Sequence, residues 1–502
     1  MPGTEGLARL TDADQAVEQT DVVIVGAGIS GIGAAWHLAR RCPGLRFVVL
    51  EALDSFGGTW RVHRYPGIRS DSDLYTYGYS FKPWTGAPLA TADEILKYMG
   101  EVIEENGLDR FIRYGHRITG ARWDGAAARW MLEGRRTDSG APFRIAAGFL
   151  WMCQGYYRHA EGRMPDWPGM DRFHGRIVHA QSWPEDLDVV GRRVVVIGAG
   201  ATAATLVPAI AGRCAHVTLL QRSPIYYRSG RIALPIADEL RELRVPEEWI
   251  HEIVRRKIQH EQAKFVGRTF SEPEAVRAEL LAQAREHLGP DHPLEPHFTP
   301  RYRPWQQRIA YIPNGDLFRC IREGTASIVT DTVETFTERG VRVTSGEELE
   351  ADVVVAATGF HLSVLGDIPF EVDGQKLDLA RTVTYRGMMF TGVPNLAWVF
   401  GYFRAAWTLR VDLVADFVCR LLEHMRCTGA RQVEVALPPE DAGMPLLPWI
   451  DPEDFNPGYL MRGLHLLPKR GDKPEWRHSQ DHWEDGKTFP AIALTDAVFV
   501  YR

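Results

Sequence analysis

The chain has 502 residues, 45% of them hydrophobic and 25% charged, a composition typical of a globular protein long enough for about two to four domains. A formal net charge of −7 offers no basic field for nucleic acid or anionic lipid. No apolar run reaches the roughly 18 residues of a membrane span, and residues 1–20 lack the pattern of a secretion signal. The six cysteines are scattered without a C-x-x-C pair, so we expect a cytoplasmic, enzyme-sized protein with reduced thiols and no metal.

A first nucleotide-binding pattern lies near the N-terminus. Residues 22–25 predict a strand, and residues 29–38 predict a helix after a turn whose G-x-G-x-x-G spacing falls on Gly26, Gly28 and Gly31. The next predicted strand ends on Glu51, which is placed to accept hydrogen bonds from a ribose diol. This order of elements indicates a site for FAD or NAD, with the phosphates at the start of the helix.

The same pattern returns at residues 192–224. Its glycines are Gly198 and Gly200, and Ala203 takes the third place. Its second strand ends in Arg222 and Ser223 instead of an acid; a cation and a hydroxyl suit the 2′-phosphate of NADP, whereas the alternative for Arg222 is a solvated surface arginine. The residues expected at the pyrophosphate are Gly198, Ala199, Gly200, Ala201 and Thr202.

A third predicted strand, at residues 352–356, precedes "ATG" at 357–359 and indicates a return crossing between two nucleotide domains. Residues 226–319 are charged, with apolar residues at helical spacing. We therefore predict an α/β fold with two Rossmann-type dinucleotide-binding domains and a helical insertion. The expected limits are 1–156 and 381–502 for the FAD domain, 157–225 and 320–380 for the NADP domain, and 226–319 for the insertion.

The segment "FHGRIVHAQSWP", residues 173–184, lies just before the second glycine turn. It does not alternate like a strand, and Gly175 with Pro184 argues against one long helix. Its Phe173, Gly175, His179 and Trp183 stand at fixed offsets. The simplest interpretation of His179 is a structural histidine that fixes a bend by hydrogen bonds.

With the two nucleotide patterns, this segment resembles the Baeyer–Villiger monooxygenases, members of the flavin-containing monooxygenase superfamily that use FAD and NADPH. Their linker signature, F-x-G-x-x-x-H-x-x-x-W-[PD], is met by residues 173–184. Their second signature, [AG]-G-x-W-x-x-x-x-[FY]-P-[GM]-x-x-x-D, is met by "GGTWRVHRYPGIRSD" at 57–71. The stretches "PWQQRIAYIPNGDLFRCIREG" and "GYFRAAWTLRVDLV" are similar to the branch that contains the ethionamide-activating monooxygenase.

The resemblance implies that NADPH reduces FAD and that the reduced flavin captures O2 as a C4a-peroxide. One oxygen atom is then inserted beside a ketone carbonyl to give an ester or a lactone. It places the cation that stabilises the developing negative charge at Arg308 and a supporting carboxylate at Asp71; the alternatives are a surface arginine and a turn or capping residue. The residues it places around FAD are Ser30, Gly31, Glu51, Gly58, Thr59, Trp60, Arg69, Ser70, Asp71 and Tyr77.

Two other reactions fit the same motifs: S- or N-oxygenation of sulfides, thioamides or amines, and NADPH oxidation by a flavin oxidase or reductase. Many relatives have Lys beside the catalytic Arg, where this chain has Gln307, which leaves the preference for NADPH over NADH open. The expected partners are O2 and a small ketone or sulfide, and not nucleic acid. The substrate, the oligomeric state and the role of the tail after about residue 440 stay open.

Overall fold

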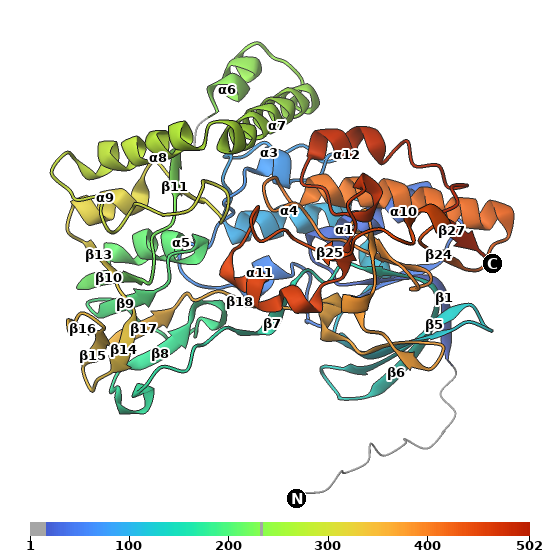
Figure 1. Cartoon of the computed structure of the whole chain (residues 1–502), viewed down its shortest axis with the longest axis horizontal. Coiled ribbons are helices and arrows are strands. Elements are labelled where there is room, and N and C mark those ends of the chain that lie inside the picture. Colours follow the sequence, from blue (N-terminus) through green and yellow to red (C-terminus); the bar gives the residue numbers. More distant parts are fainter. Residues whose placement is uncertain (1–16, 231–233) are drawn as a thin grey trace, which may run out of the picture.

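The computed structural model describes residues 17–230 and 234–502, which form two lobes, each with its own main sheet (Figure 1). Residues 1–16, most of the segment 1–20 in which we expect no secretion signal, lie outside this described part. Within it, no helix combines the length and the apolar composition that a membrane crossing requires.

The first sheet, in the right-hand lobe of Figure 1, has nine strands in the order β20-β19-β4-β5-β6-β1-β2-β3, with β23 also paired to β6. Its strands are β1 (Glu18–Val25), β2 (Phe47–Leu50), β3 (Ile112–Arg113), β4 (His116–Asp124), β5 (Arg129–Arg136), β6 (Pro142–Met152), β19 (Phe370–Val372), β20 (Gln375–Lys376) and β23 (Leu396–Trp398). Pairing among β1, β2, β3 and β6 is parallel, as a nucleotide-binding α/β unit requires.

Helices α1 (Ile29–Arg41), α4 (Ala92–Glu105) and α10 (Thr408–Thr428) cover one face of this sheet. They bury one apolar core with β1 and β2, to which α1 contributes Ile32 and Leu38 and α10 contributes Val411 and Val418. The helix α1 begins at Gly28 with no side-chain cap, so its first backbone N–H groups remain available to a ligand.

The second sheet is wholly parallel, with the order β13-β10-β9-β17-β8. Its strands are β8 (Arg176–His179), β9 (Arg193–Ile197), β10 (His216–Gln221), β13 (Ala326–Thr330) and β17 (Val353–Ala356). Helices α5 (Ala201–Ala211) and α9 (Asp316–Arg322) pack on it. The structure thus confirms an α/β fold with two Rossmann-type sheets. It corrects one detail: the segment 173–184, whose sequence shows no strand pattern, does contain a strand, because residues 176–179 form the edge strand β8.

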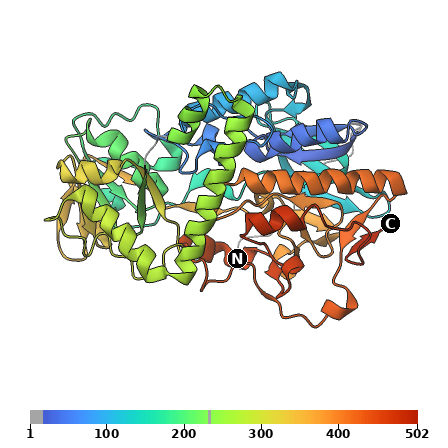
Figure 2. The same cartoon turned by 90° about the horizontal axis from the view of Figure 1, so that it is seen from above.

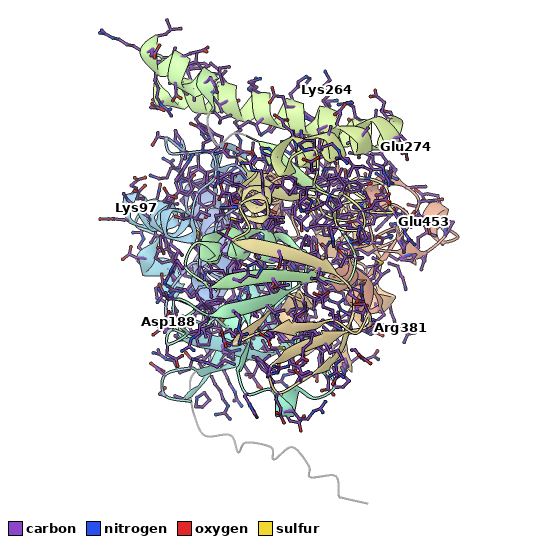
Figure 3. The ribbon with its side chains drawn as sticks, turned by 90° about the vertical axis from the view of Figure 1, so that its left-hand side faces the viewer. Lys97, Asp188, Lys264, Glu274, Arg381 and Glu453 are labelled. Carbon is purple, nitrogen blue, oxygen red and sulfur yellow. The ribbon has the colours of Figure 1, made fainter. Side chains whose placement is uncertain are left out.

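The region 226–319 is mainly helical, with α6 (Pro235–Glu242), α7 (Glu247–Ser271) and α8 (Pro273–Leu288), but it also contains β11 (Tyr227–Gly230) paired to β12 (Ala310–Pro313). Figure 2 shows α7 running across the molecule between the two lobes. In Figure 3, Lys264 and Glu274 mark α7 and α8 as a layer beyond the second sheet. The buried Arg255 ties α7 to the first lobe by donating to the carbonyl oxygens of Tyr75, Thr76 and Gly78.

Smaller elements join the lobes and complete the C-terminal part. They are α2 (Thr59–Val62), α3 (Leu74–Tyr77), β7 (Tyr157–Gly162), β14 (Val333–Phe336), β15 (Gly340–Val343), β16 (Glu348–Glu350), β18 (Phe360–Leu362), β21 (Thr384–Tyr385), β22 (Met389–Phe390), β24 (Val433–Val435), β25 (Leu447–Pro448), α11 (Gly458–Gly463), β26 (Lys469–Arg470), α12 (His482–Thr488) and β27 (Phe499–Tyr501). Because β19 pairs with β4, the chain rejoins the first sheet by residue 370, before the limit of 380 expected for the NADP domain. The domain limits themselves stay a prediction.

Glycines of the two motifs predict a sharp difference between two alanine variants. A Cβ on Gly31 would overlap the carbonyl oxygen of Gly26, whereas a Cβ on Gly200 would meet no atom within 4 Å. We expect Gly31→Ala to lower the free energy of unfolding by about 3 kcal/mol, since helix and strand would have to separate. Gly200→Ala is the matched control and should unfold like the wild type in urea. Equal stability of both variants would contradict this account of Gly31.

Candidate functional site

A cavity of about 1250 Å³ lies at the carboxyl ends of the parallel strands of the two sheets. Both glycine turns line it, together with the segments 57–60, 68–72, 153–160 and 307–310. Nearly all of the expected site residues line this cavity. They are Gly26, Gly28, Ser30, Glu51, Gly58, Thr59, Trp60, Arg69, Ser70, Asp71, Tyr77, Gly198, Ala199, Gly200, Ala201, Thr202, Arg222, Ser223 and Arg308.

The first glycine turn is held by close backbone contacts. Gly26 has φ +99°, and a Cβ there would lie 2.9 Å from the carbonyl oxygen of Cys153. Gly28 faces Gly58, so that a Cβ on Gly58 would lie 3.1 Å from the Cα of Gly28. Gly31, which we expected at the phosphates, does not line the cavity; its missing side chain lets α1 pack on the turn.

Glu51 braces this turn directly. Its Oε2 accepts a hydrogen bond of 2.7 Å from the backbone N–H of Ala27, and its Oε1 accepts one of 2.8 Å from Leu53. Burial raises the pKa of Glu51, although these backbone donors oppose the shift. The carboxylate therefore joins the end of β2 to the glycine turn and still borders the cavity.

The second glycine turn repeats this geometry at β9. Gly198 has φ +137°, and a Cβ there would overlap the carbonyl oxygen of Ala357, at the end of β17. Gly200 begins α5 with open space in front of it. Arg222 and Ser223 follow β10 and are both exposed to the cavity. Two turns of this kind, with uncapped helix starts and no Cβ in the way, have the shape that two dinucleotide pyrophosphates require.

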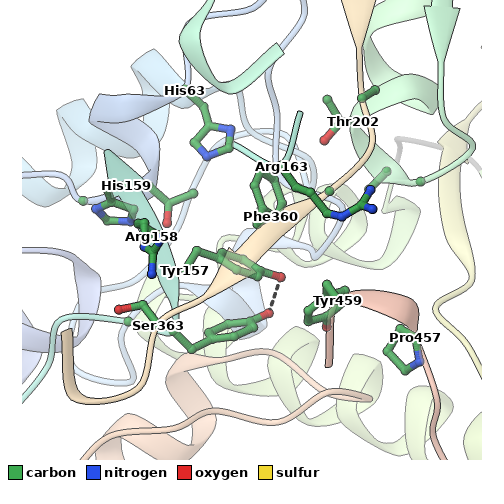
Figure 4. A pocket seen from close by; sticks show the side chains of 18 of the residues that line it. His63, Tyr157, Arg158, His159, Arg163, Thr202, Phe360, Ser363, Pro457 and Tyr459 are labelled. Carbon is green, nitrogen blue, oxygen red and sulfur yellow. Dashed lines mark hydrogen bonds between the residues drawn. The ribbon is translucent and has the colours of Figure 1, made fainter. Parts of the chain in front are cut away.

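Arg308 lies between the two turns, and phenols hold its guanidinium. Its Nε donates to the hydroxyl of Tyr459 (3.1 Å), and its Nη2 donates to the hydroxyl of Tyr156 (3.2 Å). The hydroxyls of Tyr156 and Tyr157 are 2.5 Å apart, shown by the dashed line in Figure 4. Burial opposes the charge, but these three tyrosines and Asp71 keep the pKa of Arg308 well above its usual value. Arg308 is thus a fixed cation in the cavity wall.

Asp71 and its neighbours differ in part from the expectation. Within the described residues no hydrogen bond joins Asp71 to Arg308, so Asp71 supports the cation through its charge alone. The Arg69 guanidinium pairs at 2.7 Å with Asp316 of α9, and the Ser70 hydroxyl donates to the carbonyl oxygen of Ser72. Arg69 and Ser70 therefore anchor the loop that presents Asp71, rather than pointing freely at a cofactor.

Aromatic side chains complete the wall near the first turn. Trp60 donates from Nε1 to the hydroxyl of Tyr77 at 2.9 Å, and their rings meet edge to face. Trp407 donates to the hydroxyl of Ser30 at 2.8 Å and stacks on Tyr156, with 5.2 Å between the ring centroids. Flat aromatic surfaces beside a fixed cation form a wall suited to a planar ring system.

The linker residues lie outside the cavity and act structurally. Phe173 is buried against Phe336, and a Cβ on Gly175 would overlap the carbonyl oxygen of Asp352. The Nδ1 of His179 accepts a hydrogen bond of 3.1 Å from the backbone N–H of Gln181, which starts a short turn after β8. Trp183 packs on the core of the second sheet. Burial lowers the pKa of His179, as expected of a histidine that serves the fold.

Several cavity residues gave no signal in the sequence. They are His63, Tyr156, Tyr157, Arg163, Trp407, Tyr459 and Arg462. None of them was singled out, although His63 lies inside the signature at 57–71 and Trp407 inside the stretch 401–414. Only the assembled fold brings all seven to the same cavity. The tyrosines that hold Arg308 lie 151 and 152 residues away from it in the chain.

Comparison with known proteins agrees with this architecture. Residues 24–84 match a family model described as "NAD(P)-binding Rossmann-like domain", and residues 91–236 match one described as "Flavin-binding monooxygenase-like". The chain is 45% identical over 472 residues to "FAD-containing monooxygenase EthA" of Mycolicibacterium smegmatis, covering 93% of this chain and 94% of that protein. It is 41% identical over 492 residues to "Putative FAD-containing monooxygenase MymA" of Mycobacterium tuberculosis, covering 95% and 96%.

Solved structures share the fold. One, titled "Oxidized steroid monooxygenase bound to NADP", superposes with a TM-score of 0.75 over 96% of this chain and 99% of that one, at 24% identity. At this identity the similarity shows that the fold is shared and says nothing of the reaction.

His63 predicts a pH dependence of stability. Its side chain is buried in the cavity wall, its Nε2 lacks a hydrogen-bond partner among the described residues, and burial with repulsion from His159 and His179 lowers its pKa to about 4. An unfolded histidine binds a proton below about pH 6.5, so stability is lost as the pH falls from there to about 4. The free energy of unfolding, measured by urea titration at several pH values, should fall less over this range in His63→Gln than in the wild type, by on the order of 1 to 3 kcal/mol. Exposed His174→Gln should keep the wild-type slope, and an unchanged slope in His63→Gln would refute the assignment.

Proposed function

We propose that this chain, which belongs to the family of FAD-containing monooxygenases, is a Baeyer–Villiger enzyme that uses FAD and NADPH. It would insert one oxygen atom from O2 next to the carbonyl of a small ketone and give an ester or a lactone. The observation that carries the proposal is Arg308, a cation held by phenols in the wall of a cavity that both glycine turns share.

The residues present fit both cofactors. FAD would lie on the first turn, with its diphosphate at Gly28 and Ser30, its ribose near Glu51 and its ring system toward Trp60 and Tyr77. The dinucleotide of NADPH would lie on the second turn. The residues assigned to it are Gly198, Ala199, Gly200, Ala201, Thr202, Arg222 and Ser223. When bound, these cofactors supply hydride transfer and the activation of O2.

The protein contributes position and charge. Negative charge develops on the substrate oxygen when a carbonyl is attacked, and a preorganised cation lowers the energy of that state because no solvent has to reorganise. Arg308 remains protonated at any working pH, and two phenols fix the orientation of its planar guanidinium. Trp60, Tyr156 and Trp407 give the cavity wall large apolar surfaces, and with the cofactors bound these surfaces would limit the access of water.

Transfer of oxygen to sulfur or nitrogen is the neighbouring reaction, and product analysis separates the two. The purified protein is supplied with NADPH and O2 and given either a ketone or a thioether, while NADPH consumption, H2O2 and products are quantified. An ester or lactone in proportion to NADPH supports the proposal. Sulfoxide without ester would replace it with heteroatom oxygenation, and stoichiometric H2O2 without any oxygenated product would replace it with an oxidase.

Arg308 variants test the role of the cation. Arg308→Ala should lower the rate of ester formation by about 100-fold or more, as removal of a preorganised charge-stabilising donor does in other enzymes. Arg308→Lys keeps the charge but replaces a planar guanidinium, which donates from two separate nitrogens, with a single ammonium on a flexible stem. The charge is then no longer fixed in the same place, so the rate should stay far below that of the wild type. Exposed Arg301→Ala, in the same loop, is the matched control and should leave the rate unchanged. Ester formation at the wild-type rate in Arg308→Ala would remove this residue from the reaction.

A further inference from the structure

The C-terminal tail contributes one short helix, α11, to the space between the lobes (Figure 1). Its Leu460 is buried, and a Cβ on Gly463 would overlap the side chain of Leu362 in β18, so the helix packs tightly on that strand. Two of its residues, Tyr459 and Arg462, line the cavity. Being three positions apart in a helix, they project from the same side.

Tyr459 belongs to the phenols around Arg308. Its hydroxyl accepts the hydrogen bond from the Nε of Arg308, and its ring lies edge to face against Tyr157, with 5.7 Å between centroids. The second phenol on Arg308, Tyr156, comes from the loop before β7 in the other part of the wall. Tyr459 is therefore the contact through which the tail touches the cation.

Arg462 belongs to a different cluster, with Arg163 and Arg222. The backbone N–H of Arg163 donates to the carbonyl oxygen of Gly359 (3.1 Å), and the guanidinium of Arg462 lies 3.9 Å from where a Cβ of Gly359 would stand. Desolvation lowers the pKa of Arg462, and the charges of Arg163 and Arg222 lower it further. Three guanidiniums thus gather beside the second glycine turn. Figure 4 shows Arg163 reaching into the pocket that Thr202 and Tyr459 also line.

These three arginines have no carboxylate to neutralise them among the described residues. The Asp331 carboxylate, in the same wall, accepts from the backbone N–H groups of Thr332 and Ser345, and Asp367 pairs with Arg158. Gln307 adds no charge of its own. Cations held close together without a protein anion, next to the open turn at Gly200, form a site for phosphate.

We propose that α11 joins the phosphate site to the reactive cation: Arg462, with Arg163 and Arg222, binds a phosphate of the nicotinamide dinucleotide, and Tyr459 holds Arg308 in position. The inference rests on the proposed function, since it takes NADPH as the dinucleotide. It assigns to the tail a phosphate-binding residue, Arg462, and a positioning residue, Tyr459, and Arg462 supplies a charge near the place where many relatives have Lys and this chain has Gln307.

Two variants of the same helix separate the two roles. In the FAD-loaded protein, Arg462→Gln should raise the Kd of NADP+ by about tenfold or more in calorimetric titrations. Arg462→Lys keeps a positive charge and should therefore retain part of the affinity for NADP+. Tyr459→Phe should leave that Kd within about twofold of the wild type, because no phosphate contact is lost, while H2O2 rises at the expense of oxygenated product. Exposed Arg477→Gln serves as the charge-matched control and should change neither quantity.

Titration with NAD+ identifies the phosphate. If Arg462→Gln loses affinity for NADP+ alone, Arg462 binds the 2′-phosphate. If the variant loses affinity for both NADP+ and NAD+, Arg462 binds the pyrophosphate. Either result supports the site. An unchanged Kd for both in Arg462→Gln would overturn it while leaving the proposed function intact. If the wild type binds neither dinucleotide, the proposed function itself fails. If Tyr459→Phe gives the wild-type partition between product and H2O2, the positioning role of Tyr459 is overturned.

Discussion

The arrangement of the site depends on keeping one guanidinium charged where water is scarce. Arg308 lies in the cavity wall, and removal of its hydration costs free energy that has to be offset by hydrogen bonds. A carboxylate in direct contact would offset it but would also neutralise the field that makes the residue useful. Tyr156 and Tyr459 satisfy two of its donors while carrying no charge, and Asp71 acts from a distance. The cation therefore keeps its field in the cavity.

That solution requires the two lobes and the tail to meet at one place. Tyr156 follows the central strand β6 of the first sheet, Arg308 precedes β12 in the insertion, and Tyr459 belongs to α11. Arg69 and Asp316 form a further ion pair, between the first signature and α9. Such contacts between distant segments make the geometry at Arg308 a property of the assembled molecule. A change in any of the three elements would move the guanidinium relative to both glycine turns.

The glycines connect the fold to the site. Gly26 and Gly198 adopt positive φ and press against Cys153 and Ala357, so each turn is fixed by a neighbouring parallel strand. A Cβ on Gly31 would overlap the carbonyl oxygen of Gly26, so its missing side chain allows that packing, whereas Gly200 faces open space. Glycines of the two motifs thus have different surroundings, and the resemblance that had placed Gly31 at the phosphates did not distinguish them.

The sequence by itself determined the two βαβ units, the glycine turns and the end of each second strand at Glu51 or Arg222, because these features depend on residues close together in the chain. It also pointed to Arg308 and Asp71, but only through resemblance to a family. Three features are set only by the tertiary structure: β8 joins the second sheet, Glu51 accepts a hydrogen bond from Ala27 in the glycine turn, and Arg69 forms an ion pair with Asp316. It likewise brought Tyr459 and Arg462 from the tail to the cavity. No local pattern specifies a partner some 150 residues away, since such contacts are set by the packing of whole elements.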